Sequence, residues 1–172
     1  MDSLTQIVLG AAVGEAVLGK KIGNRAMLWG AIAGTIPDLD VFIKYFTDPI
    51  TSTEMHRGIS HSLLFSIIMA PILGWITHKI HKKWEKVSLK NCSWLFFWSL
   101  VTHPLLDANT TWGTQFFWPF EYRLAYKNIF VVDPFYTVPF LAFVIIAMCY
   151  KRTNPKRTKY NNIGLIVSSS YM

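Results

Sequence analysis

The chain has 172 residues, of which 52% are hydrophobic and 16% are charged, and its formal net charge is +7. The length suits a single domain, but this balance of apolar and charged residues is unusual for a soluble domain and typical of a membrane protein. Most Lys and Arg residues cluster in three groups in alternate loops, which indicates membrane topology and contact with anionic lipid rather than nucleic-acid binding.

Five apolar segments predict membrane helices, because a bilayer core of about 30 Å requires roughly 20 mostly apolar residues in helical form. Residues 62–77, 92–106 and 134–150 are uncharged apart from His103, whereas the first two segments are shorter or more polar. In chain order they cover Leu4–Leu18, Ala26–Ile43, Ser62–Thr77, Cys92–Leu106 and Val131–Tyr150. The sequence therefore predicts an all-α fold, a polytopic membrane bundle of about five apolar helices.

The three basic groups all lie at one end of the predicted bundle. If the five helices cross in turn, every group lies on one side of the membrane, and the positive-inside rule assigns that side to the cytoplasm. The groups are Lys20, Lys21 and Arg25; Lys79, Lys82, Lys83, Lys86 and Lys90; and Lys151, Arg152, Lys156, Arg157 and Lys159. We expect residues 1–150 to form the membrane domain and residues 151–162 a basic cytoplasmic linker. Residues 163–172 begin an apolar run too short to cross a bilayer, which predicts a truncated chain or a longer parent protein.

Polar motifs occupy the opposite ends of the same helices. The second predicted helix ends in Pro-Asp-Leu-Asp, the third follows His-Arg-Gly-Ile-Ser-His, and the fourth ends in His-Pro-Leu-Leu-Asp. The residues that we expect to converge there are Asp38, Asp40, His56, His61, His103 and Asp107, with Gln6 and Asp133 as doubtful members. Ionisable groups beside hydrocarbon are rare and usually functional, so this convergence predicts one site at one end of the bundle.

The spacing within each motif predicts how its side chains are presented. His103 and Asp107 are four residues apart and share one face of a helix, although Pro104 between them predicts a kink or a helix restart. Asp38 and Asp40 are two apart, so we expect either irregular backbone or only one direct ligand from this pair. His56 and His61 require a bend between them, which Gly58 permits.

These motifs carry a family resemblance. The sequence resembles the YdjM family, bacterial inner-membrane proteins described as candidate metal-dependent hydrolases, through residues 36–40, 56–62 and 103–107, followed by Thr110 or Thr111, Gly113 and Trp118-Pro119. The resemblance implies a multi-pass protein of the bacterial inner membrane whose metal-site positions are Asp38, Asp40, His56, His61, His103 and Asp107. Gln6 is a departure, because many relatives have a histidine near the start of the first helix.

Imidazole and carboxylate side chains together predict a divalent metal ion, with zinc first and manganese or iron as alternatives. Six candidate ligands also allow two ions. A carboxylate that is not bound to metal, Asp40 in the first instance or Asp38, is a candidate general base. Arg57 offers a planar fork to a phosphate or carboxylate group of a substrate, or else contacts Asp48, Glu54 or lipid headgroups.

The segment 109–130 is rich in aromatic residues and follows Asp107 directly. Trp and Tyr gather at membrane interfaces, so the segment is either an interfacial cover or a lid that admits a lipid-like substrate.

Two residue types predict structural roles. Cys92 and Cys149 form no C-x-x-C pair, so we expect neither a zinc ribbon nor a disulfide framework. Glu15 lies about ten residues along the first helix from its polar end, and we expect it to pair with Lys20 or Arg25 rather than to join the metal group.

The function that these observations favour is a metal-dependent hydrolase that acts on an ester or phosphoester at the extracytoplasmic face. The expected partners are membrane lipid and a small-molecule or lipid substrate, without nucleic acid. The alternatives are an ion-coupled transporter, since intramembrane Asp and His also mark ion pathways, and a non-catalytic membrane protein with a structural metal site.

Overall fold

The computed structural model describes residues 1–45, 58–81 and 87–172, and every regular element in these ranges is helical. The all-α prediction is therefore confirmed. The elements are α1 (Ser3–Ile22), α2 (Asn24–Thr35), η1 (Pro37–Tyr45), η2 (Ile59–His61), α4 (Leu63–His81), α5 (Leu89–Ala108), α6 (Pro134–Cys149) and α7 (Pro155–Tyr171), where η denotes a 3-10 helix.

Capping residues in the sequence set the start of several helices. Asp2 accepts a hydrogen bond from the Thr5 amide and begins α1, which ends at Gly23 in a positive-φ conformation. Asp133 and Asn154 cap α6 and α7 in the same way, and each is followed by a proline at the first helical position.

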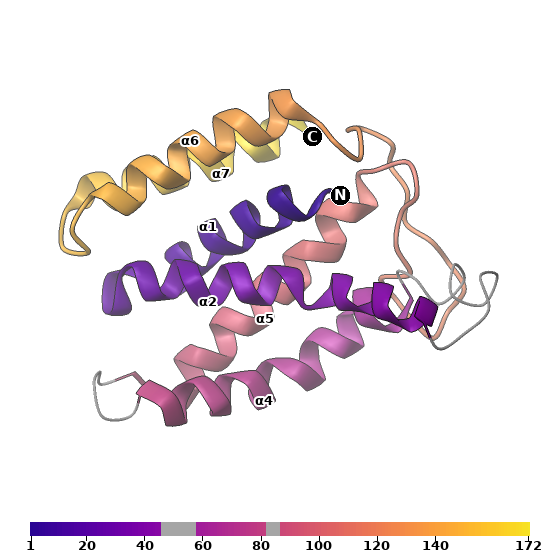
Figure 1. Ribbon diagram of the computed structural model, residues 1–172, viewed down its shortest axis with the longest axis horizontal. Coiled ribbons are helices and arrows are strands. Elements are labelled where there is room, and N and C mark those ends of the chain that lie inside the picture. The colour runs from indigo at the N-terminus through magenta and orange to yellow at the C-terminus, as the bar shows by residue number, and fades with distance from the viewer. Residues whose placement is uncertain (46–57, 82–86) are drawn as a thin grey trace.

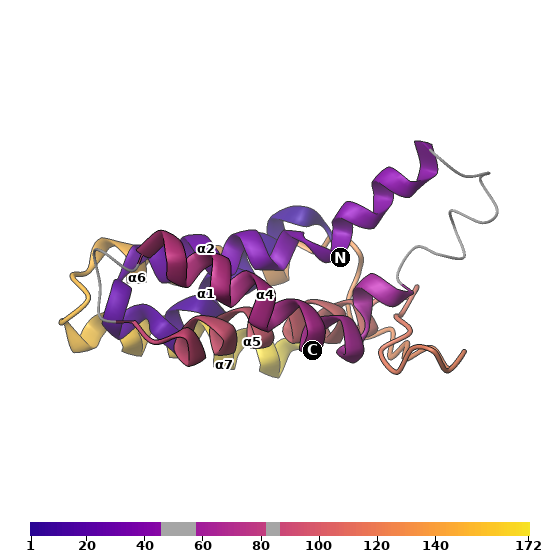
Figure 2. The same cartoon turned by 90° about the horizontal axis from the view of Figure 1, so that it is seen from below.

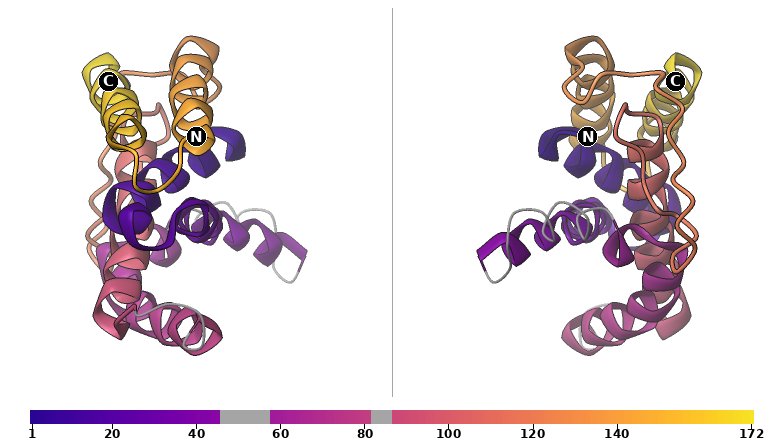
Figure 3. Two further views of the ribbon diagram at one scale, coloured as in Figure 1. Left: turned by 90° about the vertical axis from the view of Figure 1, so that its left-hand side faces the viewer. Right: turned by 90° about the vertical axis from the view of Figure 1, so that its right-hand side faces the viewer.

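Three antiparallel hairpins, α1–α2, α4–α5 and α6–α7, make up the molecule (Figure 1). Helix α1 is central, since it packs against α2, α5, α6 and α7, and α5 joins it to the α4–α5 hairpin. The end-on views of Figure 3 show the α6–α7 pair and α4 at opposite sides of the molecule, with α1, α2 and α5 between them.

Four glycines bring α1 and α2 unusually close together. A methyl group built at Gly10 would overlap the carbonyl oxygen of Gly30, and one at Gly34 would lie 2.5 Å from the carbonyl oxygen of Gln6. Gly10 and Gly14 in α1 face Gly30 and Gly34 in α2, so each helix presents a G-x-x-x-G motif to the other. Such small-residue interfaces are characteristic of helices packed in membranes.

The helices differ most from the predicted segments at Pro37 and in the C-terminal region. The second predicted helix is split, because Pro37 lacks an amide hydrogen and restricts the residue before it, so α2 ends at Thr35 and η1 follows. A helix restart at Pro104 was one alternative prediction and is wrong, because α5 continues as one helix through this residue, whereas a kink there stays a prediction. At the C-terminal side, α7 runs without interruption across the predicted boundary between residues 151–162 and 163–172.

Among the described helices, α4 alone is long and apolar enough to cross a bilayer by length and composition, and α6 is apolar but has 16 residues. Crossing by the other predicted segments stays a prediction. One side of α4 is exposed and apolar, with Ile67 and Ile68 each 52% exposed, unlike a helix in the core of a soluble protein.

The two ends of the bundle differ in character. The turns α1–α2 and α6–α7 and the adjoining ends of α4 and α5 lie at one end, on the left in Figure 1. Elements η1 and η2, the C-terminal end of α5 and the segment 109–133 lie at the other, and η1 projects beyond the neighbouring helices in Figure 2. The basic turns and the polar motifs are therefore separated, as the predicted topology requires.

Candidate metal centre

Four side chains from three separate motifs converge at the polar end. Asp38 in η1, His61 in η2, and His103 and Asp107 in α5 each offer one ligand atom, and these atoms all lie within 4.8 Å of one another. The side chains of His61, His103 and Asp107 are fully buried, whereas that of Asp38 is 26% exposed. Asp38 therefore forms the accessible edge of the cluster.

The spacing of these atoms fits a small cation. His61 Nε2 lies 3.1 Å from His103 Nε2, 3.5 Å from Asp107 Oδ2 and 3.6 Å from Asp38 Oδ1. His103 Nε2 lies 3.4 Å from Asp38 Oδ1 and 3.9 Å from Asp107 Oδ2. Ligands about 2.0–2.1 Å from a tetrahedral zinc ion are about 3.3 Å from one another, so the residues present fit such an ion with small adjustments.

The orientation of His103 is set from the side away from the cluster. Its Nδ1 lies 2.6 Å from the carbonyl oxygen of Gly34, and because a carbonyl only accepts, Nδ1 carries the hydrogen. Nε2 is then the ring atom with a lone pair directed at the cluster, as a metal ligand requires. Gly34 reaches this position because of the close packing of α1 and α2, so the glycine motifs contribute directly to the site.

His61 is oriented by Ser60 of its own motif and by Asp40 of the Pro-Asp-Leu-Asp motif. The hydroxyl of Ser60 donates to Asp40 Oδ2 at 2.7 Å and lies 3.0 Å from His61 Nδ1, which itself lies 3.3 Å from Asp40 Oδ2. Nδ1 therefore donates toward this hydroxyl and carboxylate, and Nε2 faces the four-atom cluster. The structure places Asp40 behind the imidazole ring, not within the group of ligand atoms.

Asp107 is held by the start of α1. Gln6 Nε2 donates to Asp107 Oδ1 at 3.0 Å, and the amino group of Met1 also contacts this oxygen. Gln6 thus borders the cluster, although its side-chain oxygen is not among the converging ligand atoms. That oxygen is buried and has no hydrogen-bond partner among the described residues.

The carboxylates change the protonation of the cluster. Burial alone lowers the pKa of His61, but hydrogen bonds to Asp107, Asp38 and Asp40 outweigh burial and raise this pKa to about 10. Burial alone raises the pKa of Asp38, but hydrogen bonds to His103 and His61 lower it by more, so this pKa lies below its ordinary value. Without a cation, His61 is therefore protonated at neutral pH and balances part of the negative charge.

The remaining predicted site residues lie elsewhere. His56 and Arg57 fall outside the described residues. Asp133 caps α6, where it accepts from the Tyr136 amide and from the Tyr171 hydroxyl, and it is not part of the four-atom cluster.

Glu15 lies outside the cluster, as predicted, but its expected partners were wrong. Arg157 of α7 donates to Glu15 through two nitrogens, at 2.6 and 2.5 Å, and both side chains are 2% exposed. Gly19 provides the space for this carboxylate, since a methyl group there would overlap it.

Sequence reasoning missed Gly34 and Ser60 as contributors to the site. The paired G-x-x-x-G motifs in residues 10–14 and 30–34 are a signal that could have placed Gly34 at a helix contact. Ser60 lies inside the His-Arg-Gly-Ile-Ser-His motif, but nothing in its spacing indicates a bond to Asp40.

The aromatic segment borders the cluster and is largely exposed. The Phe116 carbonyl accepts from the Leu63 amide, and Thr114 Oγ1 donates to the Pro104 carbonyl, so the segment is fixed to both motif-bearing helices. Phe116 is 8% exposed, but most of the other aromatic side chains are at least half exposed: Trp112, Phe117, Phe120, Tyr122, Tyr126 and Phe130.

Comparisons with known proteins identify the family of this chain. A family model described as YdjM inner membrane protein matches residues 1–172. The inner membrane protein YbcI of Escherichia coli (strain K12) is 33% identical over 153 residues, which cover 84% of this chain and 86% of that protein. No solved structure matches the chain significantly. The chain therefore belongs to the YdjM family of inner membrane proteins.

Proposed function

We propose that this protein is a multi-pass metal-dependent hydrolase of the bacterial inner membrane that acts on an ester or phosphoester bond at the extracytoplasmic face. The observation that carries the proposal is the convergence of two imidazole nitrogens and two carboxylate oxygens at distances that suit one cation. The orienting contacts on the far side of each imidazole ring support it, because metal-binding histidines are usually held in this way.

Zinc is the ion that we propose, since the donor set and its spacing suit tetrahedral coordination. A bound divalent ion lowers the pKa of water and polarises a carbonyl or phosphoryl oxygen, which is the chemistry of hydrolysis. His61, His103 and Asp107 would hold it from the buried side. A catalytic site needs one position open to water, and the partial exposure of Asp38 supports an opening at η1.

The two carboxylates of η1 have different proposed roles. Asp38 is at the accessible edge, where it is either a fourth ligand or the general base that takes a proton from attacking water. Asp40 is a positioning residue, because it contacts Ser60 and the far side of His61. Three further roles stay predictions: Asp40 as general base, Arg57 in substrate binding and His56 as a ligand.

The substrate that we propose is a lipid or another molecule that reaches the site from the membrane interface. The exposed aromatic side chains of residues 112–130 support this, since Trp and Tyr favour the level of the lipid headgroups. Five membrane crossings, with the basic turns in the cytoplasm, would place this segment and the cluster on the outer side. In support of crossing, α1 and α5 each have 20 residues, a length of about 30 Å.

Metal analysis of the detergent-purified protein tests the site itself. We expect about one transition-metal ion per chain, predominantly zinc, and loss of most of it in His61→Ala and Asp107→Ala. His78→Ala is the matched control, because His78 lies near the opposite end of α4 and should leave the metal content unchanged. Equal metal content in all four proteins would contradict the proposed centre, and elemental analysis separates zinc from manganese and iron.

A hydrolysis assay separates an enzyme from a structural metal protein. The metal-loaded protein should cleave members of a panel of phospholipids and soluble phosphoesters, and Asp38→Asn should abolish cleavage. Retained metal with no cleavage of any panel member would favour a structural site. Ion flux in liposomes that depends on Asp107 would favour a transporter, although the cluster lies at one end of the bundle rather than near its middle, where transport sites usually lie.

A further inference from the structure

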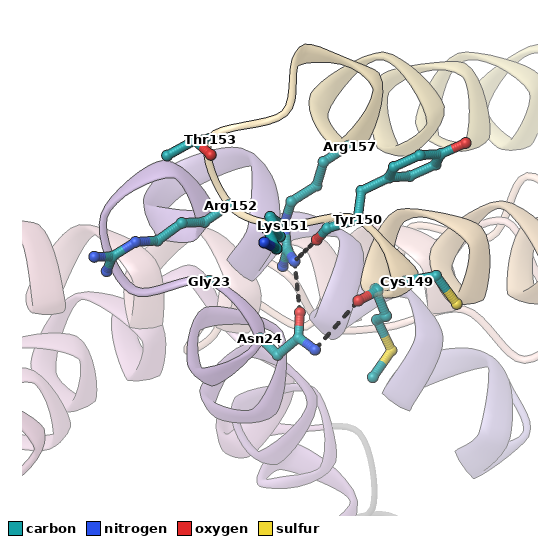
Figure 4. A pocket seen from close by; sticks show the side chains of 9 residues that line it. Gly23, Asn24, Cys149, Tyr150, Lys151, Arg152, Thr153 and Arg157 are labelled. Carbon is teal, nitrogen blue, oxygen red and sulfur yellow. Dashed lines mark hydrogen bonds between the residues drawn. The ribbon is translucent and has the colours of Figure 1, made fainter.

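The end of the bundle opposite the metal centre contains a groove lined by basic residues. Two cavities of about 530 and 620 Å³ adjoin there, since Arg152 and Thr153 line both of them. They lie between the α1–α2 turn and the α6–α7 turn, and Figure 4 shows the first of them. We call the two together the basic groove, defined by Lys20, Asn24, Lys151, Arg152, Arg157 and Lys159.

The groove has a surplus of positive charge. No Asp or Glu is among the residues that line either cavity. Arg157 is neutralised by its two bonds to Glu15 beneath the groove. Lys20, Lys151, Arg152 and Lys159 are exposed and form no ion pair with any part of the chain that the structure describes.

Several of the lining groups are held in place by the fold. Arg152 donates through one guanidinium nitrogen to the Lys21 carbonyl at 2.8 Å, which ties the α6–α7 turn to the end of α1. Arg157 donates to Asn24 Oδ1 at 2.6 Å and to the Tyr150 carbonyl at 2.9 Å, as Figure 4 shows. The groove is thus formed by two turns that are distant in sequence but linked by an exposed hydrogen bond from Arg152 and a half-buried one from Arg157.

The residues that line the groove indicate the kind of anion that would fit it. Met148 and Cys149 of α6 line one cavity, so an apolar edge adjoins the cationic surface. A free phosphate ion would leave this edge unused, whereas a phospholipid presents a phosphate and apolar chains together. Basic pockets between helices of inner-membrane proteins are known sites for anionic headgroups.

We propose that the basic groove binds the phosphate headgroup of an anionic phospholipid. Two of its lysines come from different hairpins, Lys20 from α1 and Lys159 from α7. A bound headgroup would therefore bridge α1–α2 to α6–α7 at the end where Arg152 already links them. This inference does not depend on the metal centre or on hydrolysis.

The test uses native mass spectrometry of the full chain in detergent with cardiolipin, with phosphatidylcholine as the neutral lipid. We expect cardiolipin to bind selectively, and Lys20→Gln together with Lys159→Gln to weaken its binding about tenfold or more. The matched control is Lys79→Gln with Lys90→Gln, which removes the same charge near the same end but outside both cavities. The control should bind cardiolipin within about twofold of the unmodified protein.

Three outcomes would overturn the proposal. Equal weakening in the two double variants would show diffuse attraction to the whole basic end. Displacement of cardiolipin by excess inorganic phosphate would make the groove a site for free phosphate. If the variants do not fold, thermal unfolding of the unmodified protein decides the matter, and a midpoint raised no more by cardiolipin than by phosphatidylcholine would reject the site.

Discussion

His61 uses both of its ring nitrogens. Nε2 belongs to the four-atom cluster, and Nδ1 contacts Ser60 and Asp40, so one side chain joins the ligand group to the groups that orient it. Asp38 and Asp40 are close in sequence, but the 3-10 helix η1 sends them to opposite edges of this ring. The sequence predicted either irregular backbone here or only one direct ligand from the pair. In the structure, Asp38 belongs to the ligand cluster and Asp40 does not.

Replacing Asp40 tests its positioning role. Asp40→Asn should leave about one ion per chain but weaken zinc binding roughly 10–100-fold, because His61 loses the carboxylate that orients it. Competition with a chelator of known affinity measures the change. Asp133→Asn is the control, since this carboxylate is also buried but caps α6. Complete loss of metal in Asp40→Asn would instead make Asp40 a ligand.

The raised pKa of His61 predicts a pH dependence of metal binding. With its pKa at about 10, the imidazole is protonated at neutral pH, and zinc must displace this proton. The affinity for zinc should therefore rise with pH, by about tenfold per pH unit from the release of this proton alone. The rise should continue until the pH approaches the pKa of His61. Calorimetric titration in two buffers of different ionisation enthalpy counts the proton released. Affinity that is constant between pH 6 and 8 would contradict this protonation state.

At the scale of the helices, the α1–α2 contact connects packing to the site. Gly30 lies against the backbone of Gly10 and Gly14, and the next glycine of its motif, Gly34, accepts the hydrogen bond of His103. The sequence identified both segments as helices, but the predicted second helix was too long: α2 ends at Thr35, and the irregular backbone that was expected as one alternative at Asp38 and Asp40 begins there.

Gly30→Ala should destabilise the protein, although alanine is favoured over glycine in an isolated helix by about 1 kcal/mol. The added methyl group would overlap the Gly10 carbonyl oxygen and push the helices apart, at a cost of about 1–3 kcal/mol or more. Thermal unfolding in detergent measures the stability, and zinc affinity should fall as Gly34 moves. Ile32→Ala, on the exposed side of α2, is the control. A higher midpoint for Gly30→Ala would show that the contact is not tight.

At the scale of the whole molecule, the α6–α7 hairpin is fastened to the rest of the bundle by polar contacts as well as by packing. Arg157 binds Glu15 at the basic end, and Asn161 donates to the Ala12 carbonyl further along α7. Both contacts are buried, so α7 belongs to the same folded unit as α1.

Removing one member of the buried Glu15–Arg157 ion pair should destabilise the protein more than replacing both members. Glu15→Leu alone leaves the Arg157 guanidinium buried without its carboxylate and should lower the free energy of unfolding by about 3–5 kcal/mol. The double variant Glu15→Leu with Arg157→Met should recover much of this loss, since no buried charge remains. Denaturant titration in mixed micelles compares them. A double variant no more stable than Glu15→Leu would mean that the hydrogen bonds of Arg157 to Asn24 and Tyr150 matter more than the ion pair.

The sequence by itself determined the helical class, the separation of basic turns from polar motifs, and the set from which the ligand cluster is drawn. These follow from local properties: apolar runs, capping residues and the alternation of helix ends. Only the tertiary structure decided that Gly34 orients His103, that the two histidines face each other, and that Arg157 neutralises Glu15. These contacts join residues 69, 42 and 142 positions apart, and no local rule links such residues until the helices have packed.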